Sequence, residues 1–123
     1  MKYILLISTL MFSAGSWAEW TEVFSADGDV IYVELDSIKK AKGLVYYWMI
    51  GDNLEPDSSG TLSFKAYAKA DCETMRSMAL SISTYKLPMA EGDASSTFTP
   101  DPKWRSAQPD SVMETTLEAV CNH

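Results

Sequence analysis

The sequence holds only two cysteines, Cys72 and Cys121, and the single bond that they can form limits how the chain can fold. Neither cysteine lies in a Cys-x-x-Cys redox motif, so in an oxidising compartment the expected product is a structural disulfide. Closing a loop of this length would stabilise the fold by about 4 kcal/mol, a large share of the roughly 5–15 kcal/mol typical of small domains. The disulfide is therefore expected if the chain is exported.

The first residues indicate export. Lys2 precedes an apolar run over residues 3–12, and small residues then lead to Ala18. This order is typical of a signal peptide, and the run is too short for a permanent transmembrane anchor. We expect a signal peptide over residues 1–18 and a single domain over 19–123, periplasmic or secreted after cleavage. An uncleaved membrane anchor is the alternative.

The charge of the chain excludes one class of partner. The 123 residues carry a formal net charge of −7, and the basic residues are dispersed except for Lys39, Lys40 and Lys42. Nucleic acids are bound through clustered lysine and arginine, so no nucleic-acid partner is expected. An acidic domain of this size could instead inhibit a basic enzyme such as lysozyme.

Turn residues divide the first half of the chain into strands. Asp27-Gly28-Asp29 separates two β-prone runs and predicts a hairpin. Residues 44–50 are aromatic and β-branched, which predicts a strand with both faces apolar. Residues 62–69 alternate between apolar and polar and predict a half-exposed strand.

Residues 71–85 fit either a helix or a strand, because their apolar residues satisfy both periods. Ser, Thr and Ile are enriched toward the end of the segment, and this favours a strand. In a strand without a bulge, Met78, Leu80 and Ile82 share one face with Cys72. A C-terminal helix tethered through Cys72 would then cover that face.

The C-terminal segment predicts a capped amphipathic helix. A short strand around residues 94–98 is expected first, followed by an irregular proline-rich connection. Ser111 is a good N-cap, and Glu114 three residues later completes a capping-box pattern. The apolar face of this helix would carry Met113, Leu117, Val120 and Cys121.

Candidate catalytic and metal-binding residues are scarce. The only histidine is His123 at the terminus, and the sequence has no Gly-rich phosphate loop or nucleophile elbow. The aspartates near residues 27 and 52 lack the periodicity of a calcium loop and suit turns. We therefore expect a protein that is not an enzyme and has no cofactor or metal site.

Aromatic residues gather near the middle of the chain. Tyr46, Tyr47 and Trp48 are most simply explained as filling both faces of a central strand, although aromatic residues also anchor interfaces. Any exposed set should lie on the face opposite the helix. The candidate binding surface there consists of Lys65, Tyr67 and Lys69.

The order of several residues along the chain resembles the surface-adhesin protein E family, small exported proteins of Gram-negative bacteria. The pattern comprises Trp20, Tyr32, Asp36-Ser37-Ile38, an aromatic strand, Asp71-Cys72, Arg76, Tyr85, Gly92, Trp104, Pro109-x-Ser111 and a terminal helix ending in Cys121. The resemblance covers essentially all of residues 19–123. It implies an α+β fold, with an antiparallel sheet of about six strands and a C-terminal helix packed on one face and tethered by the disulfide, and it favours a strand after Cys72.

The resemblance also implies a non-enzymatic protein-binding module. A known member of the family binds host proteins such as vitronectin, laminin and plasminogen, so the resemblance implies a host extracellular protein as partner, with an envelope protein as the alternative. That known member of the family is an outer-surface lipoprotein. The signal peptide of this chain has no cysteine at its expected cleavage site, so we expect no lipid anchor. The chain is acidic, which weakens the transfer of any family binding mode that depends on exposed lysines.

Five residues of the pattern have expected structural roles. Asp36 and Ser37 should cap a turn through bonds to their own backbone. Asp71 and Arg76 should pair across a bend near the disulfide. Trp104 should pack under the helix as a core anchor.

Overall fold

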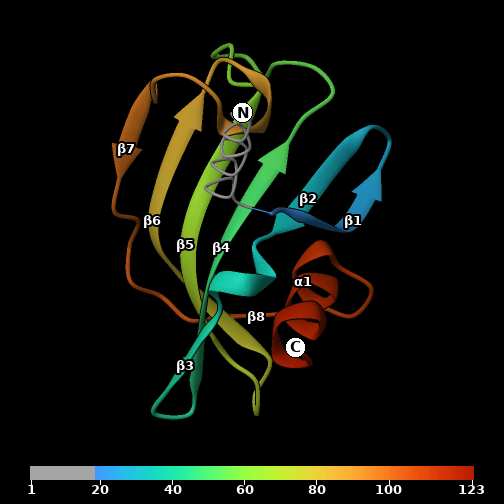
Figure 1. Ribbon diagram of the computed structural model, residues 1–123, viewed down its shortest axis with the longest axis vertical. Coiled ribbons are helices and arrows are strands. Elements are labelled where there is room, and N and C mark those ends of the chain that lie inside the picture. The colour runs from blue at the N-terminus through green and yellow to red at the C-terminus, as the bar shows by residue number, and fades with distance from the viewer. Residues whose placement is uncertain (1–18) are drawn as a thin grey trace, which may run out of the picture.

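The computed structural model describes residues 19–123, so the expected signal peptide lies outside the described residues. The described chain forms an antiparallel sheet and one α-helix (Figure 1). None of its helices is long and apolar enough to cross a membrane. The elements are β1 Thr21–Ala26, β2 Asp29–Val33, η2 Leu35–Ser37, β3 Lys39–Ala41, β4 Leu44–Asp52, β5 Ser63–Asp71, β6 Arg76–Tyr85, η3 Pro88–Ala90, β7 Ser96–Phe98, β8 Arg105–Ser106 and α1 Val112–Cys121.

The sheet has the order β1-β2-β4-β5-β6-β7, with β3 paired to β4 and β8 paired to β6. Consecutive strands are joined mainly by hairpins, as in the predicted turn at Asp27 and Gly28. Both residues have positive φ, at 54° and 89°, which matches the right-handed twist of the strands that they join. The α+β fold with an antiparallel sheet is confirmed.

The helix packs on one face of the sheet, near β1 and β2 (Figure 1). Its side chains Leu117 and Val120 are fully buried against Val33, Tyr47 and other residues of the same sheet face. Because successive side chains of a strand point to opposite faces, the neighbours of Tyr47 in β4 lie on the far side. That far side, facing away from α1, is called the open face below.

The start of α1 has the predicted cap. The Ser111 Oγ accepts a hydrogen bond from the Glu114 amide at 3.1 Å. In a capping box the Glu114 carboxylate would accept a hydrogen bond from the amide of the N-cap residue, Ser111. Here it accepts from the amide of Asp110, one residue earlier, at 2.9 Å. At the other end, Cys121 forms the predicted disulfide with Cys72, with their Cα atoms 5.8 Å apart.

The segment after Cys72 is a strand, as the sequence favoured, but its faces differ from those expected. Ala79 pairs with Ala68 and Ser81 pairs with Tyr67, so Leu80 is an extra residue between them. Such a β-bulge reverses the alternation of side chains beyond it. The sequence alone gives no sign of this one-residue insertion.

The bulge separates residues that were expected to share a face. Met78 pairs with Lys69 on the open face, whereas Ile82 pairs with Ala66 on the helix side. Cys72 lies in the turn between β5 and β6 instead of within a strand. The expectation that Met78 and Ile82 lie together under the helix is therefore wrong.

Candidate binding surface

Aromatic rings from two central strands pack together on the open face. Trp48 of β4 pairs across the strands with Tyr67 of β5, and their ring centroids are 4.7 Å apart. The ring of Tyr46 is stacked 6.2 Å from that of Tyr67. All three are half-buried, while Tyr47 is buried under α1 and hydrogen-bonds Ser77. The aromatic run therefore fills the core on one side only.

Basic side chains lie over the rings of Trp48 and Trp104. The Lys65 Nζ is 5.3 Å from the centroid of the Trp48 ring. The Lys69 Nζ and the Arg76 Cζ lie 5.4 Å and 5.3 Å from the centroid of the Trp104 ring. A cation held over an aromatic face is attracted by the ring quadrupole, which restrains these flexible side chains. The candidate residues Lys65, Tyr67 and Lys69 thus lie within one aromatic and cationic surface.

Trp104 belongs to this surface and not to the helix interface. It lies between Lys69, which pairs with Tyr46 on the open face, and Arg76. The short strand β8, immediately after Trp104, pairs with the start of β6 and holds the connection at that edge. The expectation that Trp104 packs under the helix is wrong, because this long-range pairing decides its position.

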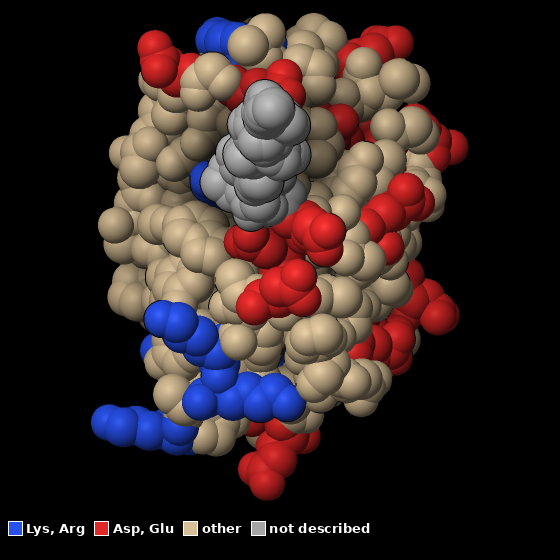
Figure 2. All heavy atoms as spheres, in the orientation of Figure 1, with Lys and Arg blue, Asp and Glu red and all other residues tan. Residues whose placement is uncertain are grey.

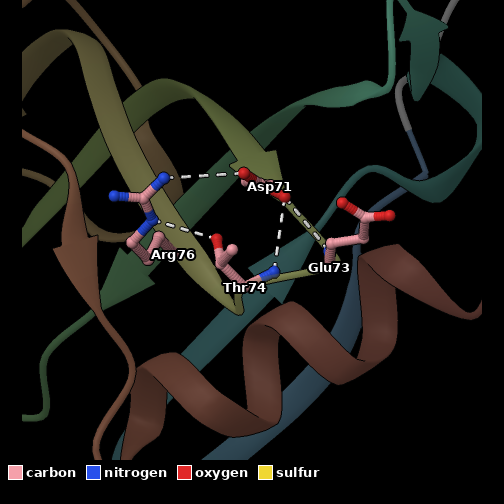
Figure 3. A network of polar contacts seen from close by, with 4 residues as sticks. All are labelled: Asp71, Glu73, Thr74 and Arg76. Carbon is pink, nitrogen blue, oxygen red and sulfur yellow. Dashed lines mark hydrogen bonds and ion pairs between the residues drawn. The ribbon is translucent and has the colours of Figure 1, made fainter.

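Asp71 and Arg76 face each other across the turn between β5 and β6 (Figure 3). The Arg76 Nη2 is 3.6 Å from the Asp71 Oδ2, and its Nε donates to the Thr74 Oγ1 at 2.9 Å. The Asp71 Oδ1 accepts from the amides of Glu73 at 3.1 Å and Thr74 at 3.4 Å. This network fixes the turn beside the disulfide and orients the guanidinium that lies over Trp104.

The stability that Asp71 contributes should depend on pH. Partial burial raises the pKa of its carboxyl, but hydrogen bonds from Thr74 and Glu73 and the charge of Arg76 together lower the pKa below its ordinary value. A carboxyl with a lower pKa in the folded state stabilises the fold above its unfolded pKa, near 3.9, and this contribution is lost as pH falls through the folded pKa. Urea unfolding of Asp71→Asn should therefore show its deficit relative to wild type at neutral pH, and the deficit should shrink in acid. A deficit that stays constant with pH would contradict this cause.

Four other residues of the family pattern lie before, in and just after the first hairpin. Ser37, in η2, donates from its Oγ to the backbone oxygen of Glu34 at 3.1 Å, which gives it a turn-capping contact. Asp36 is exposed, and no side-chain hydrogen bond to it occurs among the described residues. Trp20 is half-buried just before β1, and Tyr32 pairs with Ile50 on the open face.

Acidic side chains gather on a different part of the molecule from the aromatic and cationic surface. Figure 2 shows them on the side of β1, β2 and α1, while basic side chains gather toward the β3 end of the sheet. A hollow of about 460 Å³ beside the β1–β2 turn is lined in part by Asp27, Asp29, Glu55 and Asp57. Hydrogen bonds from Ser59 and Thr61 lower the pKa of Asp57, so its carboxylate stays charged. From the sequence, the aspartates of this group are expected only as turn residues.

Comparison with known proteins supports one family. The family model for surface-adhesin protein E matches residues 20–122. The structure resembles crystal form II of Haemophilus influenzae protein E with a TM-score of 0.56 at 14% identity, covering 81% of this chain and 91% of that one. Protein E from non-typeable Haemophilus influenzae gives 0.59 at 12% identity, covering 82% and 75%.

No curated protein sequence matches the chain significantly. At such low identity, the likeness to the solved structures shows the fold alone. The family model, in contrast, spans nearly all of the described residues. The chain therefore belongs to the surface-adhesin protein E family.

Proposed function

We propose that this chain is an exported, non-enzymatic protein-binding module that contacts its partner through the open face. The observation that carries the proposal is an aromatic cluster with cations over two of its rings. Trp48 packs on Tyr67 with Lys65 over its ring, and Lys69 and Arg76 lie over the ring of Trp104. Tryptophan, tyrosine and arginine are the side chains that most often anchor protein interfaces. The rings are half-buried, so they are held in place and still accessible to a partner.

The charge of this surface defines the kind of partner. The chain as a whole is acidic, at −7, and three of its few cations lie on this one surface. Lys65 and Lys69 flank Tyr67 on the same side of β5, roughly 13 Å apart along the strand. We propose a host extracellular or envelope protein that presents an acidic segment to this face. Binding should weaken with salt, because exposed charges are screened.

Export is a separate part of the proposal. We propose that residues 1–18 are removed after Ala18 and that the mature protein is periplasmic or secreted, without a lipid anchor. Fractionation of cells of the native organism, followed by intact-mass analysis of the protein, tests the proposed export and cleavage. The expected product begins at Glu19 and is lighter than the reduced chain by two hydrogens. A lipid-modified or unprocessed mass would contradict it.

Charge reversal on the open face should weaken binding. The double variant Lys65→Glu and Lys69→Glu removes both cations that flank Tyr67 and places carboxylates against an acidic partner. We expect affinity for the captured partner to fall about 10–100-fold, equivalent to roughly 1.4–2.8 kcal/mol. The measurement is binding of the purified variant to host matrix proteins and to an envelope extract.

The matched control is Lys40→Glu with Lys42→Glu, which makes the same change in net charge on the hairpin of β3. Lys40 pairs with Val45, a residue of the helix side, so this control leaves the open face intact. The control should bind nearly as the wild type does. Equal loss in both variants would assign binding to overall charge and contradict the role of the open face.

The acidic hollow beside the β1–β2 turn favours a second candidate, inhibition of a basic enzyme such as lysozyme. Its carboxylates from Asp27, Asp29, Glu55 and Asp57 could face the cationic surface of such an enzyme. A lysozyme activity assay with and without the protein distinguishes the two functions. Inhibition relieved by Asp27→Asn with Asp29→Asn would support the second candidate, and unchanged activity at excess protein would exclude it.

A further inference from the structure

A pocket opens between the first turn of α1 and the sheet, on the opposite side of the molecule from the open face. We propose that this helix pocket binds an elongated apolar molecule that carries a hydrogen-bond acceptor at its buried end and a cationic group at its outer end. Its volume of about 280 Å³ is just below the roughly 300–1,000 Å³ typical of small-ligand sites. The lining residues are Ile31, Tyr47, Met49, Phe64, Ser77, Val112, Met113 and Thr116.

The pocket follows from how α1 is attached. The second half of the helix is fixed by the buried Leu117 and Val120 and by the disulfide of Cys121. The first turn, in contrast, contributes Val112, which is 39% exposed, and Met113, which is only partly buried. The helix therefore closes on the sheet at one end and leaves apolar surface uncovered at the other.

A glycine in the central strand shapes the wall of the pocket. Gly51 of β4 pairs with Phe64 of β5, and a Cβ at Gly51 would lie only 2.1 Å from the Phe64 ring. The absent side chain allows that ring to lie against the sheet. Any larger residue at position 51 would force the ring to move, so the glycine maintains the present shape of the wall.

The inner end of the pocket has an unused hydrogen-bond donor. The Tyr47 Oη and the Ser77 Oγ are 3.2 Å apart and share one hydrogen bond. Two hydroxyls carry two protons, so one O–H remains without a partner among residues 19–123. Burial raises the pKa of Tyr47, which keeps its hydroxyl protonated. A carbonyl oxygen placed here would satisfy a donor that is costly to leave unpaired.

The hollow next to the exposed Val112 side of the pocket is acidic. A second hollow, of about 370 Å³, shares Ile31 and Val112 with the helix pocket, so the two hollows are neighbours. Its lining includes Asp27, Asp29 and Asn53. The apolar pocket therefore has a hydroxyl donor in its own lining and a pair of carboxylates in the hollow next to it. This polarity fits a ligand with a cationic outer end and disfavours one with a carboxylate there.

Two matched linear probes test the proposal by calorimetry with the mature, oxidised protein. Methyl ω-aminodecanoate carries an ester carbonyl and an ammonium, and monomethyl decanedioate carries the same ester and a carboxylate. We expect the amino ester to bind at least tenfold more tightly than the carboxylate, and increasing salt to reduce the difference. No binding of either probe, or equal binding of both, would overturn the proposal.

Substitutions locate the binding. Val112→Trp places a large ring at the mouth and should reduce binding at least tenfold, whereas Glu118→Trp adds the same ring on the exposed side of α1 and should leave binding unchanged. Asp27→Asn with Asp29→Asn does not alter the apolar lining and should remove the preference for the amino ester. Unaltered binding to Val112→Trp, or an unaltered preference in the double aspartate variant, would contradict the assigned site. Neither result bears on partner binding at the open face.

Discussion

Replacing Cys121 with serine should lower the free energy of unfolding by about 4 kcal/mol, according to the loop-entropy model for a disulfide that spans 49 residues. The loss should be concentrated in α1. This helix has ten residues, which is too short for stability in water without its contacts to the sheet. Urea unfolding measures the global loss, and amide exchange in residues 112–121 measures the local loosening.

The double variant Cys72→Ser with Cys121→Ser separates the disulfide from the effect of a free thiol. It should match Cys121→Ser within about 0.5 kcal/mol, because both lack the same cross-link. Wild-type protein reduced under native conditions should show the same faster exchange in α1. Unchanged exchange in residues 112–121 after loss of the bond would contradict the tethering role of the disulfide.

Leu117→Ala should cost about 2–5 kcal/mol of stability, the range for removing a large aliphatic side chain from a packed core. Leu117 is fully buried between α1 and the sheet, in the same cluster as Val33 and Tyr47. The cavity left behind would lie where the helix is held most tightly. The shift in the urea midpoint at constant slope gives the loss.

Leu54→Ala is the matched control, because it makes the same chemical change at a side chain that is 65% exposed. It should change the free energy of unfolding by less than about 0.5 kcal/mol. Similar losses in the two variants would mean that the contact between α1 and the sheet contributes little to stability. That result would also remove the basis for a helix pocket with a fixed shape.

Local signals in the sequence predicted the elements whose formation depends on local chemistry. Asp27-Gly28 indicated the first hairpin because both residues tolerate the positive φ that its turn requires. Ser111 with Glu114 indicated the start of α1 through its capping bonds. With only two cysteines, Cys72 could pair only with Cys121. The position of Lys65, Tyr67 and Lys69 opposite the helix followed from the alternation along β5.

Features that depend on distant pairing could not be predicted in this way. The extra residue at Leu80 reverses the faces of β6, yet a β-bulge leaves no pattern in the letters around it. Trp104 lies within a proline-rich connection, and only the pairing of β8 with β6 brings it to Lys69. The helix pocket draws residues from four strands and α1, so no single segment could indicate it.

Photo-cross-linking from the open face tests the central claim most directly. A photoreactive amino acid replaces Tyr67 in protein expressed in its native organism, and the protein is then exposed to extracellular matrix proteins. The cross-link reports which molecule touches this surface. The same substitution at Glu118, on the exposed side of α1, is the matched control. We predict a discrete cross-linked partner from position 67 that is absent from position 118 and is reduced by Lys65→Glu with Lys69→Glu. A partner captured from position 118 and not from position 67 would show that binding occurs on the helix side, and it would contradict the proposed role of the open face.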